Sequence, residues 1–253
     1  MKIFFHDNFL QSYTWDPAAS PERLDHAIKL VEEKFEIIAP SPTIDDNILL
    51  AHTESHLNSV KSEKKIYEMA LLAAGATIEA SDEAMTGSSA FALCRPPGHH
   101  ASPSHSWGFC YFNNVAVAVK RLLSTGEINR ALIVDFDLHF GDGTANIVSG
   151  IDEIDFLYLE DTMGDSAAEA LNKQLDDIDT DIDIIAVSAG FDRHMDCWGG
   201  MLETDDYRSL GTVLSFYARE KCNGRIFAAL EGGYNPIALG ESVLAFCEGV
   251  AGN

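Results

Sequence analysis

Short apolar runs alternate along the chain with longer amphipathic segments. The short runs are continuously apolar, which is typical of strands covered on both faces. Seven strands are predicted: Lys2–Phe5, Glu36–Ala39, Ala90–Cys94, Ala131–Phe136, Asp155–Leu159, Asp183–Ser188 and Arg225–Leu230. Because helical patterns separate them, we expect an α/β fold built on a mostly parallel, doubly wound sheet.

The segments between these runs carry apolar residues at helical spacing. Helices are predicted over Tyr67–Ala80, Asn114–Leu123 and about Pro236–Val250. Ser20 precedes a further helical start at Pro21, and Thr204 is a plausible N-cap for a helix over Asp205–Lys221. No internal repeat, low-complexity stretch or linker interrupts the pattern, so one domain over residues 1–253 is expected.

Charge is the unusual feature of the composition. The 253 residues hold 40 acidic and 17 basic side chains, a formal net charge of −23. Such a chain is a poor nucleic-acid binder, because the phosphate backbone would be repelled. A solvated acidic surface is the first interpretation, and a surface that attracts cationic substrates is the alternative.

Cysteine spacing and hydropathy indicate a cytoplasmic protein. The five cysteines are scattered, with no C-x-x-C pair, so neither a disulfide framework nor a structural zinc site is expected. The first residues, MKIFFHDNF, lack the apolar stretch of a signal peptide. No apolar run approaches the ~18 residues of a membrane span, and no membrane partner is expected.

Polar clusters follow four of the predicted strands. In a parallel sheet these carboxyl ends share one rim, where ligands bind. Four segments are concerned: Arg95–His100, Asp135–His139, Phe191–Asp192 and Glu231–Tyr234.

Asp137 and His139 stand two residues apart, so in an extended segment their side chains point the same way. Asp192, after a neighbouring strand, would add a third ligand. Two carboxylates and an imidazole suit a divalent metal such as Zn²⁺, and three protein ligands leave a position for water, as in catalytic sites. The alternative is an acidic turn whose aspartates cap helices.

Adjacent His99 and His100 lie in a loop stiffened by two prolines. One of them could take a proton from a water and later protonate a leaving amine. Such histidines need carboxylates that fix the tautomer, and Asp135 and Asp142 are the natural partners. Loop histidines without a catalytic role are the alternative.

Tyr234 follows Gly232 and Gly233, which permit a turn that projects the phenol into a cleft. There it could bind a developing oxyanion; a tyrosine that packs at a helix start is the alternative. Phe109, after Gly108, is the aromatic residue expected on a pocket wall, and Gly108, Phe109 and Gly232 are assigned to substrate binding. Arg95 is expected near a leaving acid or in a salt bridge.

Together these motifs resemble the zinc-dependent histone deacetylase superfamily, which includes acetylpolyamine amidohydrolases and bacterial and archaeal deacetylase-like proteins. The motifs are RPPGHHA from Arg95, GFCYFNN from Gly108, DFDLH from Asp135, GDGT from Gly141, SAGFD from Ser188 and EGGYN from Glu231. The resemblance implies an arginase/deacetylase-like three-layer fold and metal-dependent hydrolysis of linear amides.

The resemblance also implies roles, position by position. Asp137, His139 and Asp192 become the zinc ligands, with iron(II) as the alternative metal. His99 is backed by Asp135, and His100, the proton carrier, by Asp142. Tyr234 polarises the acyl carbonyl and Phe109 lines the acyl-lysine tunnel. The family often binds a structural K⁺ or Na⁺ beside the zinc, and Asp135, Asp137 and His139 match part of that site, where the contacts from Asp137 and His139 include backbone carbonyls.

Three departures from the family pattern stand out. Phe140 replaces a second histidine, and Glu160 stands where a serine often helps to bind the monovalent cation. The segments between His56 and Ala70 and between Glu160 and Asp183 are short, so a long active-site loop and the second tunnel aromatic are expected to be missing. An open, shallow site is predicted.

The function expected is hydrolysis of an N-acyl amine, such as acetyl-lysine or an acetylated small amine. The substrate partner is a small molecule or a peptide, and the protein is expected to be a monomer. Two alternatives are an arginase-type ureohydrolase, which would need two metals, and a non-catalytic acyl-amine binder.

Overall fold

A parallel β-sheet forms the centre of the molecule in the computed structural model, which describes residues 1–160 and 166–252. Within these ranges, seven strands pair in the order β2-β1-β3-β7-β6-β4-β5, and all six pairings are parallel. The strands are β1 Lys2–Phe4, β2 Glu36–Ile38, β3 Ala90–Ala92, β4 Ala131–Asp135, β5 Ile154–Tyr158, β6 Ile184–Ala189 and β7 Ile226–Leu230.

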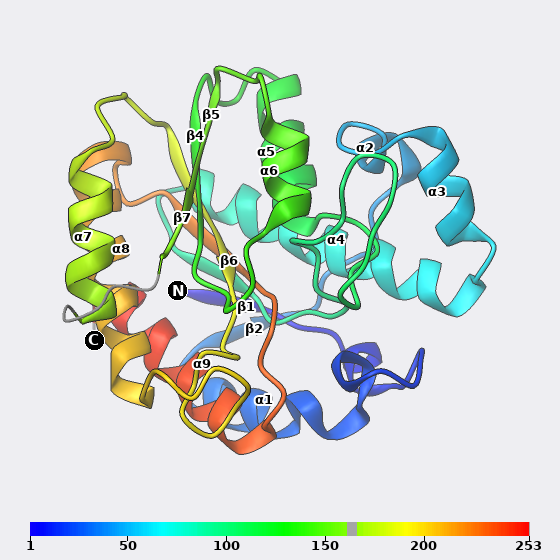
Figure 1. Cartoon of the computed structure of the whole chain (residues 1–253), viewed down its shortest axis with the longest axis horizontal. Helices are drawn as coiled ribbons and strands as arrows, with labels where there is room; N and C mark the ends of the chain where they lie inside the picture. Colours follow the sequence, from blue (N-terminus) through cyan, green and yellow to red (C-terminus); the bar gives the residue numbers. More distant parts are fainter. Residues whose placement is uncertain (161–165, 253) are drawn as a thin grey trace.

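Helices cover both faces of this sheet, which gives the expected three layers (Figure 1). One layer holds α1 (Asp25–Glu32), α7 (Ala167–Asp176), α8 (Thr204–Cys222) and α9 (Pro236–Ala251); the other holds α4 (Lys64–Met85), α5 (Asn114–Ser124) and α6 (Asp142–Val148). The short helices α2 (Asp45–Ile48) and α3 (Glu54–Lys61) lie beside α4 (Figure 1).

The central strands are buried along their whole length, as their continuous apolar sequences predict. Every residue of β3, β4, β6 and β7 is buried, and one hydrophobic cluster runs between the layers. Below the rim, Phe136 packs against Phe191 and Phe246 with ring centroids 5.8 and 5.2 Å away. The polar residues at the strand ends are thereby held on a rigid apolar support.

All seven predicted strands are confirmed, with ends that differ by one or two residues. The caps differ more. Ser20 precedes a 3₁₀ turn over Pro21–Leu24, but its hydroxyl bonds Glu22 and caps no backbone N–H. Thr204 is the first residue of α8 and not its N-cap. The N-cap is Glu203, which forms a capping box with Asp206. The helices α2, α3, α6 and α7 were not predicted.

Candidate active site

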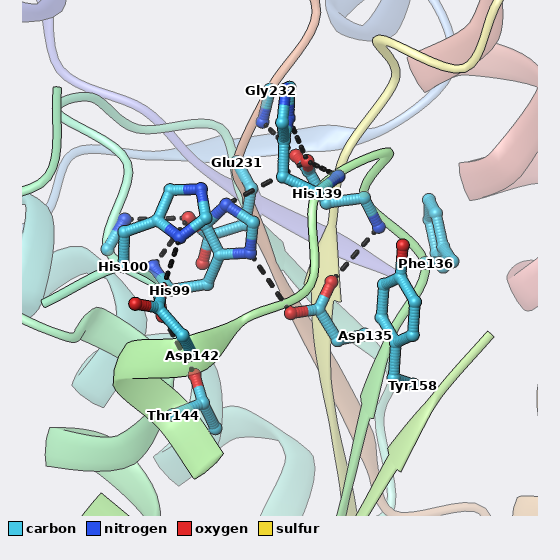
Figure 2. Close-up of polar contacts among 12 residues, drawn as sticks. His99, His100, Asp135, Phe136, His139, Asp142, Thr144, Tyr158, Glu231 and Gly232 are labelled. Atoms are coloured by element: carbon cyan, nitrogen blue, oxygen red, sulfur yellow. Dashed lines mark hydrogen bonds and ion pairs between the residues drawn. The ribbon is translucent and has the colours of Figure 1, made fainter. Parts of the chain in front are cut away.

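The four neighbouring strands β3, β7, β6 and β4 end at one rim of the sheet and carry the polar clusters there. Figure 2 shows this convergence: His99 and His100 come from the loop after β3, His139 from the segment after β4, and Glu231 and Gly232 from the end of β7. Residues far apart in the sequence therefore face a common space.

Asp137, His139 and Asp192 form a compact group of metal-ligand type, with ligand atoms all within 4.8 Å of one another. His139 directs Nδ1 toward both carboxylates, at 3.2 Å from Asp137 Oδ1 and 3.0 Å from Asp192 Oδ2. The two aspartates are at most 1% exposed. The three side chains predicted as ligands are thus brought together, and Nδ1 is the ligand atom that His139 offers.

The backbone fixes these carboxylates and leaves no room for other side chains. Asp137 accepts N–H bonds from His139 and Gly232, and Asp192 Oδ1 accepts one from Leu138. A Cβ on Gly232 would lie 2.6 Å from Asp137 Oδ2, and one on Gly190 only 2.1 Å from it. Gly232 is therefore required for its backbone N–H and its lack of a side chain, and it also lines the cavity.

The charges on these three side chains favour the binding of a cation. Burial opposes ionisation of Asp137, but nearby His99 and the hydrogen bonds from His139 and Gly232 lower its pKa. Hydrogen bonds to Asp137 and Asp192 raise the pKa of His139 to about 10. Burial raises the pKa of Asp192, and Asp137 adds to this shift. The ring of His139 thus carries a proton between two carboxylates, where a divalent ion would satisfy all three groups.

The donor set fits a zinc-like ion. Asp192 Oδ2 is buried, and the protonated ring of His139 is the group that faces it, with Nδ1 3.0 Å away. A buried carboxylate oxygen needs such a positive partner, and a bound cation would take over this role once His139 loses its proton. One nitrogen and carboxylate oxygens suit Zn²⁺ and leave an open position.

His99 is paired with Asp135, as predicted for the first histidine. Its Nδ1 lies 3.0 Å from Asp135 Oδ2, and its Nε2 lies 3.8 Å from Asp137 Oδ1. Burial disfavours a charge on His99, but Asp137 and Asp135 outweigh it and hold the pKa of His99 well above its usual range. The contact with Asp135 therefore fixes the orientation of His99, and the two carboxylates favour its protonated form in the metal-free site.

His100 forms a hydrogen bond with Asp142, which Figure 2 shows. Asp142 also accepts a hydrogen bond from Trp107. His100 Nδ1 lies 2.6 Å from Asp142 Oδ1, while the indole N–H of Trp107 donates to Oδ2 at 2.9 Å. The indole also covers the imidazole, with centroids 3.9 Å apart. Burial and neighbouring His99 lower the pKa of His100 to about 4, so its ring is neutral and can accept a proton.

Local backbone geometry places Trp107 there. Gly108 has φ +59°, and a Cβ at this position would lie 2.4 Å from His100 Cδ2. Phe109 is also left-handed, at φ 66°, which is a costly conformation for a bulky residue. This turn lays one aromatic residue on His100 and turns the next toward the opposite wall. Gly108 thus lines the site as predicted and serves mainly to let the chain approach His100.

Tyr234 is held between an aromatic and a cationic group. The ring of Trp198 stacks on it with centroids 3.9 Å apart, and the guanidinium of buried Arg23 lies 5.2 Å from the centroid of the Tyr234 ring. Arg23 also donates to the carbonyls of Gly233 and Glu231, which fixes the glycine turn. Burial raises the pKa of Tyr234, so the phenol stays protonated and can donate a hydrogen bond.

A cavity of about 330 Å³ opens above these groups. Its lining holds the two histidines of the pair, the metal-site histidine, Tyr234 and three aromatic walls, Trp107, Phe109 and Trp198. Phe109 stands edge-on to Tyr234 and Trp198, at 6.0 and 6.5 Å. Trp107 and Trp198 are about half exposed, at 51% and 52%. Sequence reasoning placed only Phe109 on the wall and gave neither tryptophan a role.

Glu231, like the two tryptophans, was given no role by the sequence. It is fully buried, and Oε2 accepts N–H bonds from Gly98 and His99 at 2.6 and 3.1 Å. Burial raises its pKa to about 7. The signal was its position at the end of β7, before the glycine pair. Glu231 joins the tyrosine turn to the histidine loop.

The expectations for Arg95 are wrong. Its guanidinium is buried, but its partners among the described residues are the main-chain carbonyls of Phe9, Gln11, Ala18 and Ser20, outside the cavity. Arg95 therefore ties down the N-terminal segment.

The structure gives a mixed outcome for the departures. Phe140 is half exposed, packs beside Phe156 and Tyr158, and is not a member of the metal-ligand group. The chain between His56 and Ala70 forms the end of α3 and the start of α4, with no long loop. The expectation of a missing tunnel aromatic after Glu160 falls partly on residues 161–165, outside the described residues.

The fold and the site define a class: an α/β protein with convergent metal-ligand side chains and two histidine–aspartate pairs at the rim of a parallel sheet. The family profile of the histone deacetylase domain matches residues 17–161, more than half of the chain. A probable deacetylase of Archaeoglobus fulgidus is 30% identical, over 92% of this chain and 81% of that protein. The chain belongs to the histone deacetylase family.

Other relatives are longer proteins. Histone deacetylase 6 of Caenorhabditis elegans is 28% identical, and the match covers 89% of this chain but 27% of that protein. The chloroplastic histone deacetylase 14 of Arabidopsis thaliana is 34% identical, and the match covers 70% of this chain and 52% of that protein. Among solved structures, the HDA15 HD domain superposes with a TM-score of 0.85 at 22% identity, over 100% of this chain and 91% of that one. This likeness supports the arginase/deacetylase-like fold.

Proposed function

We propose that this protein is a zinc-dependent deacylase that hydrolyses a linear N-acyl amine. The observation that carries the proposal is the position of neutral, aspartate-bound His100 and of protonated Tyr234 on the same cavity as the ligand group of Asp137, His139 and Asp192. A base, an oxyanion donor and a metal site around one small volume suit amide hydrolysis.

Each residue has a separate task in this proposal. When bound, the metal would polarise the acyl oxygen and lower the pKa of a water. His100 takes the proton of that water and returns it to the leaving nitrogen, and Asp142 holds its tautomer. His99 supplies positive charge, and Tyr234 donates to the oxyanion. Phe109, Trp107 and Trp198 exclude water around the acyl-amine chain.

The cavity supports the proposed substrate class. Its lining is neutral and aromatic apart from the reacting groups, and its mouth is formed by half-exposed tryptophans. A slim aliphatic chain bearing an acetylated nitrogen fits such a wall, as in acetyl-lysine or an acetylated small amine. The short loops support an open entrance.

Three further points belong to the same proposal. All five cysteines are free, which supports a cytoplasmic location. The net charge of −23 supports a protein without nucleic-acid partners, and we propose a monomer. Among the described residues, no helix combines the length and the apolar character that a membrane crossing needs.

The experiment is turnover by protein loaded with zinc and, anaerobically, with iron(II). The panel contains fluorogenic acetyl-lysine, acetylated diamines and longer acyl-lysines, with a hydroxamate as inhibitor. We expect hydroxamate-sensitive amine release, and Tyr234→Phe should lower kcat by about 10²–10³ while metal stays bound, because one oxyanion donor is lost.

The outcomes separate the alternatives. Release of urea from a guanidino substrate with two metals per chain would support the ureohydrolase. Saturable binding of acyl amines without release, at one zinc per chain, would support the non-catalytic binder. Full activity of Tyr234→Phe would remove the oxyanion role.

A further inference from the structure

The guanidinium of Arg193 lies inside the protein, against the backbone that carries the metal ligands. Arg193 is 3% exposed and directly follows Asp192. Its Nε donates to the carbonyl oxygens of Phe136 and Asp137, both at 3.1 Å. An arginine so buried is costly unless its donors are satisfied, so these contacts are a built feature.

The other side of the guanidinium reaches the end of β5. Its Nη2 donates to the carbonyl oxygen of Leu159 at 2.6 Å and contacts the hydroxyl of Tyr158 at 3.0 Å. That hydroxyl donates in turn to the carbonyl of Leu138 at 2.8 Å, and Figure 2 shows Tyr158 beside Phe136 and Asp135. The guanidinium of Arg193, which follows β6, is therefore surrounded by oxygen atoms from the ends of β4 and β5.

Such a ring of carbonyl and hydroxyl oxygens is what a monovalent cation would require. The resemblance implied K⁺ or Na⁺ near Asp135, Asp137 and His139. Both carboxylate oxygens of Asp135 are occupied, by the N–H of Asp137 and by His99, and its carbonyl accepts the N–H of Leu159. The carbonyl of Asp137 accepts from Arg193. The residues present do not fit a free ion there, because a cation among these oxygens would meet the guanidinium and be repelled.

We infer that Arg193 supplies the positive charge of this site and replaces the free monovalent cation. The inference rests on the proposed metal-dependent function, since the charge supports the backbone between the metal ligands. Arg193 is a positioning residue: it ties the segment of Asp137 to the segment of Asp192. The backbone carbonyl of Arg193 accepts N–H bonds from Met201 and Leu202, both at 2.9 Å, so the backbone of Arg193 is itself held in place.

The first test uses the unaltered protein and needs no turnover. The thermal unfolding midpoint and the zinc affinity are measured in KCl, NaCl and choline chloride at equal ionic strength. We expect the same midpoint and the same affinity in all three salts. A saturable rise specific to K⁺ or Na⁺ would overturn the inference, because it would show a free ion bound.

The second test creates the need for an ion. Arg193→Ala removes the charge and leaves space, whereas the matched Arg193→Met removes the charge and fills the space. In choline chloride, both variants should bind zinc about 10–100-fold more weakly, as for other residues that orient metal ligands. KCl, or guanidinium ion at a low and non-denaturing concentration, should restore the affinity of Arg193→Ala only.

The outcomes are separable. Arg193→Ala with unchanged zinc affinity, or without ion-dependent rescue, would contradict the inference. If both variants fail to fold, the salt series on the unaltered protein decides it. If no acyl amine is hydrolysed while the unaltered protein is insensitive to K⁺, the proposed function fails and the inference about the charge stands.

Discussion

Trp198 stacks on Tyr234 with ring centroids 3.9 Å apart and planes 23° apart. The indole comes from the loop after β6 and the phenol from the turn after β7, so the contact joins two neighbouring strand ends. The guanidinium of Arg23 also contacts the phenol ring, 5.2 Å from its centroid, so the ring has little freedom to rotate. The tryptophan thus forms a wall of the cavity and orients the oxyanion donor at once.

Removing this wall should impair catalysis more than metal binding. In Trp198→Ala we expect kcat to fall about 10–100-fold, because small misplacements of a catalytic group carry costs of this size. Trp198→Phe keeps an aromatic face and should retain most of the activity. Steady-state kinetics and metal content of both variants are the measurement, and an unchanged kcat in Trp198→Ala would show that Tyr234 is held by other contacts.

A second prediction concerns the indole N–H of Trp107. In Trp107→Phe the ring can still cover His100, but Asp142 Oδ2 loses its donor. A hydrogen bond to a charged group is worth about 1.5–3 kcal/mol, so kcat should fall roughly 10–100-fold with little change in KM. Trp107→Leu, which also removes the aromatic cover, should be worse. Equal activity of the phenylalanine variant and the unaltered protein would mean that Asp142 needs no second partner.

Metal loading should stabilise the fold. At free zinc about 100-fold above Kd the gain is about 2.7 kcal/mol, and for a domain of this size that raises the unfolding midpoint by roughly 5–10 °C. Differential scanning calorimetry with and without chelator measures it. Asp192→Asn is the control, because losing one carboxylate ligand should abolish most of the shift.

The same titration should release about one proton per chain near pH 7. The pKa of His139, about 10 without metal, means that its ring is protonated at neutral pH and must lose that proton to become a ligand. Calorimetric titrations in buffers of different ionisation enthalpy count the protons. Zinc binding without proton release would show that His139 is not a ligand.

Acid should weaken the fold through His52. This histidine is 4% exposed, its Nδ1 donates to the carbonyl of Ser102, and its Nε2 accepts the N–H of Asn113. Burial, with a smaller contribution from His56, lowers its pKa to about 3, against about 6.5 unfolded. Between these values the unfolded chain binds the extra proton, so the stability that is full above pH 6.5 is lost as pH falls through the window.

The size of this effect can be measured against His52→Gln, whose amide can both donate and accept. One proton corresponds to about 1.4 kcal/mol per pH unit, so the free energy of unfolding should fall by roughly 2 kcal/mol more in the unaltered protein between pH 6.5 and 5. Urea unfolding at several pH values provides the comparison. As a control, the variant of exposed His105, His105→Gln, should show the same decrease in the free energy of unfolding as the unaltered protein. If His52→Gln also shows the full decrease, a group other than His52 causes it.

The sequence predicts the strands well because buried parallel strands are continuously apolar. The convergence of the predicted ligands and histidines at one rim is also predictable from the sequence, because the carboxyl ends of parallel strands lie at the same edge of a sheet. Trp198, Glu231 and Arg193 could not be given roles in this way. Their partners come from other strand ends, so the contacts exist only in three dimensions and leave no local pattern. The short helices α2 and α6 have four and seven residues, about one and two turns, which is too short for an amphipathic repeat to be recognised in the sequence.

The position of β7 has a consequence for how the molecule is assembled. Among the described strands it comes last in the sequence, yet it lies between β3 and β6. Without β7, the native pairings leave two separate half-sheets, β2-β1-β3 and β6-β4-β5. His99 belongs to the first half and the metal ligands to the second. Insertion of the final strand closes the gap, so metal capture with both histidines in place would mark the end of folding.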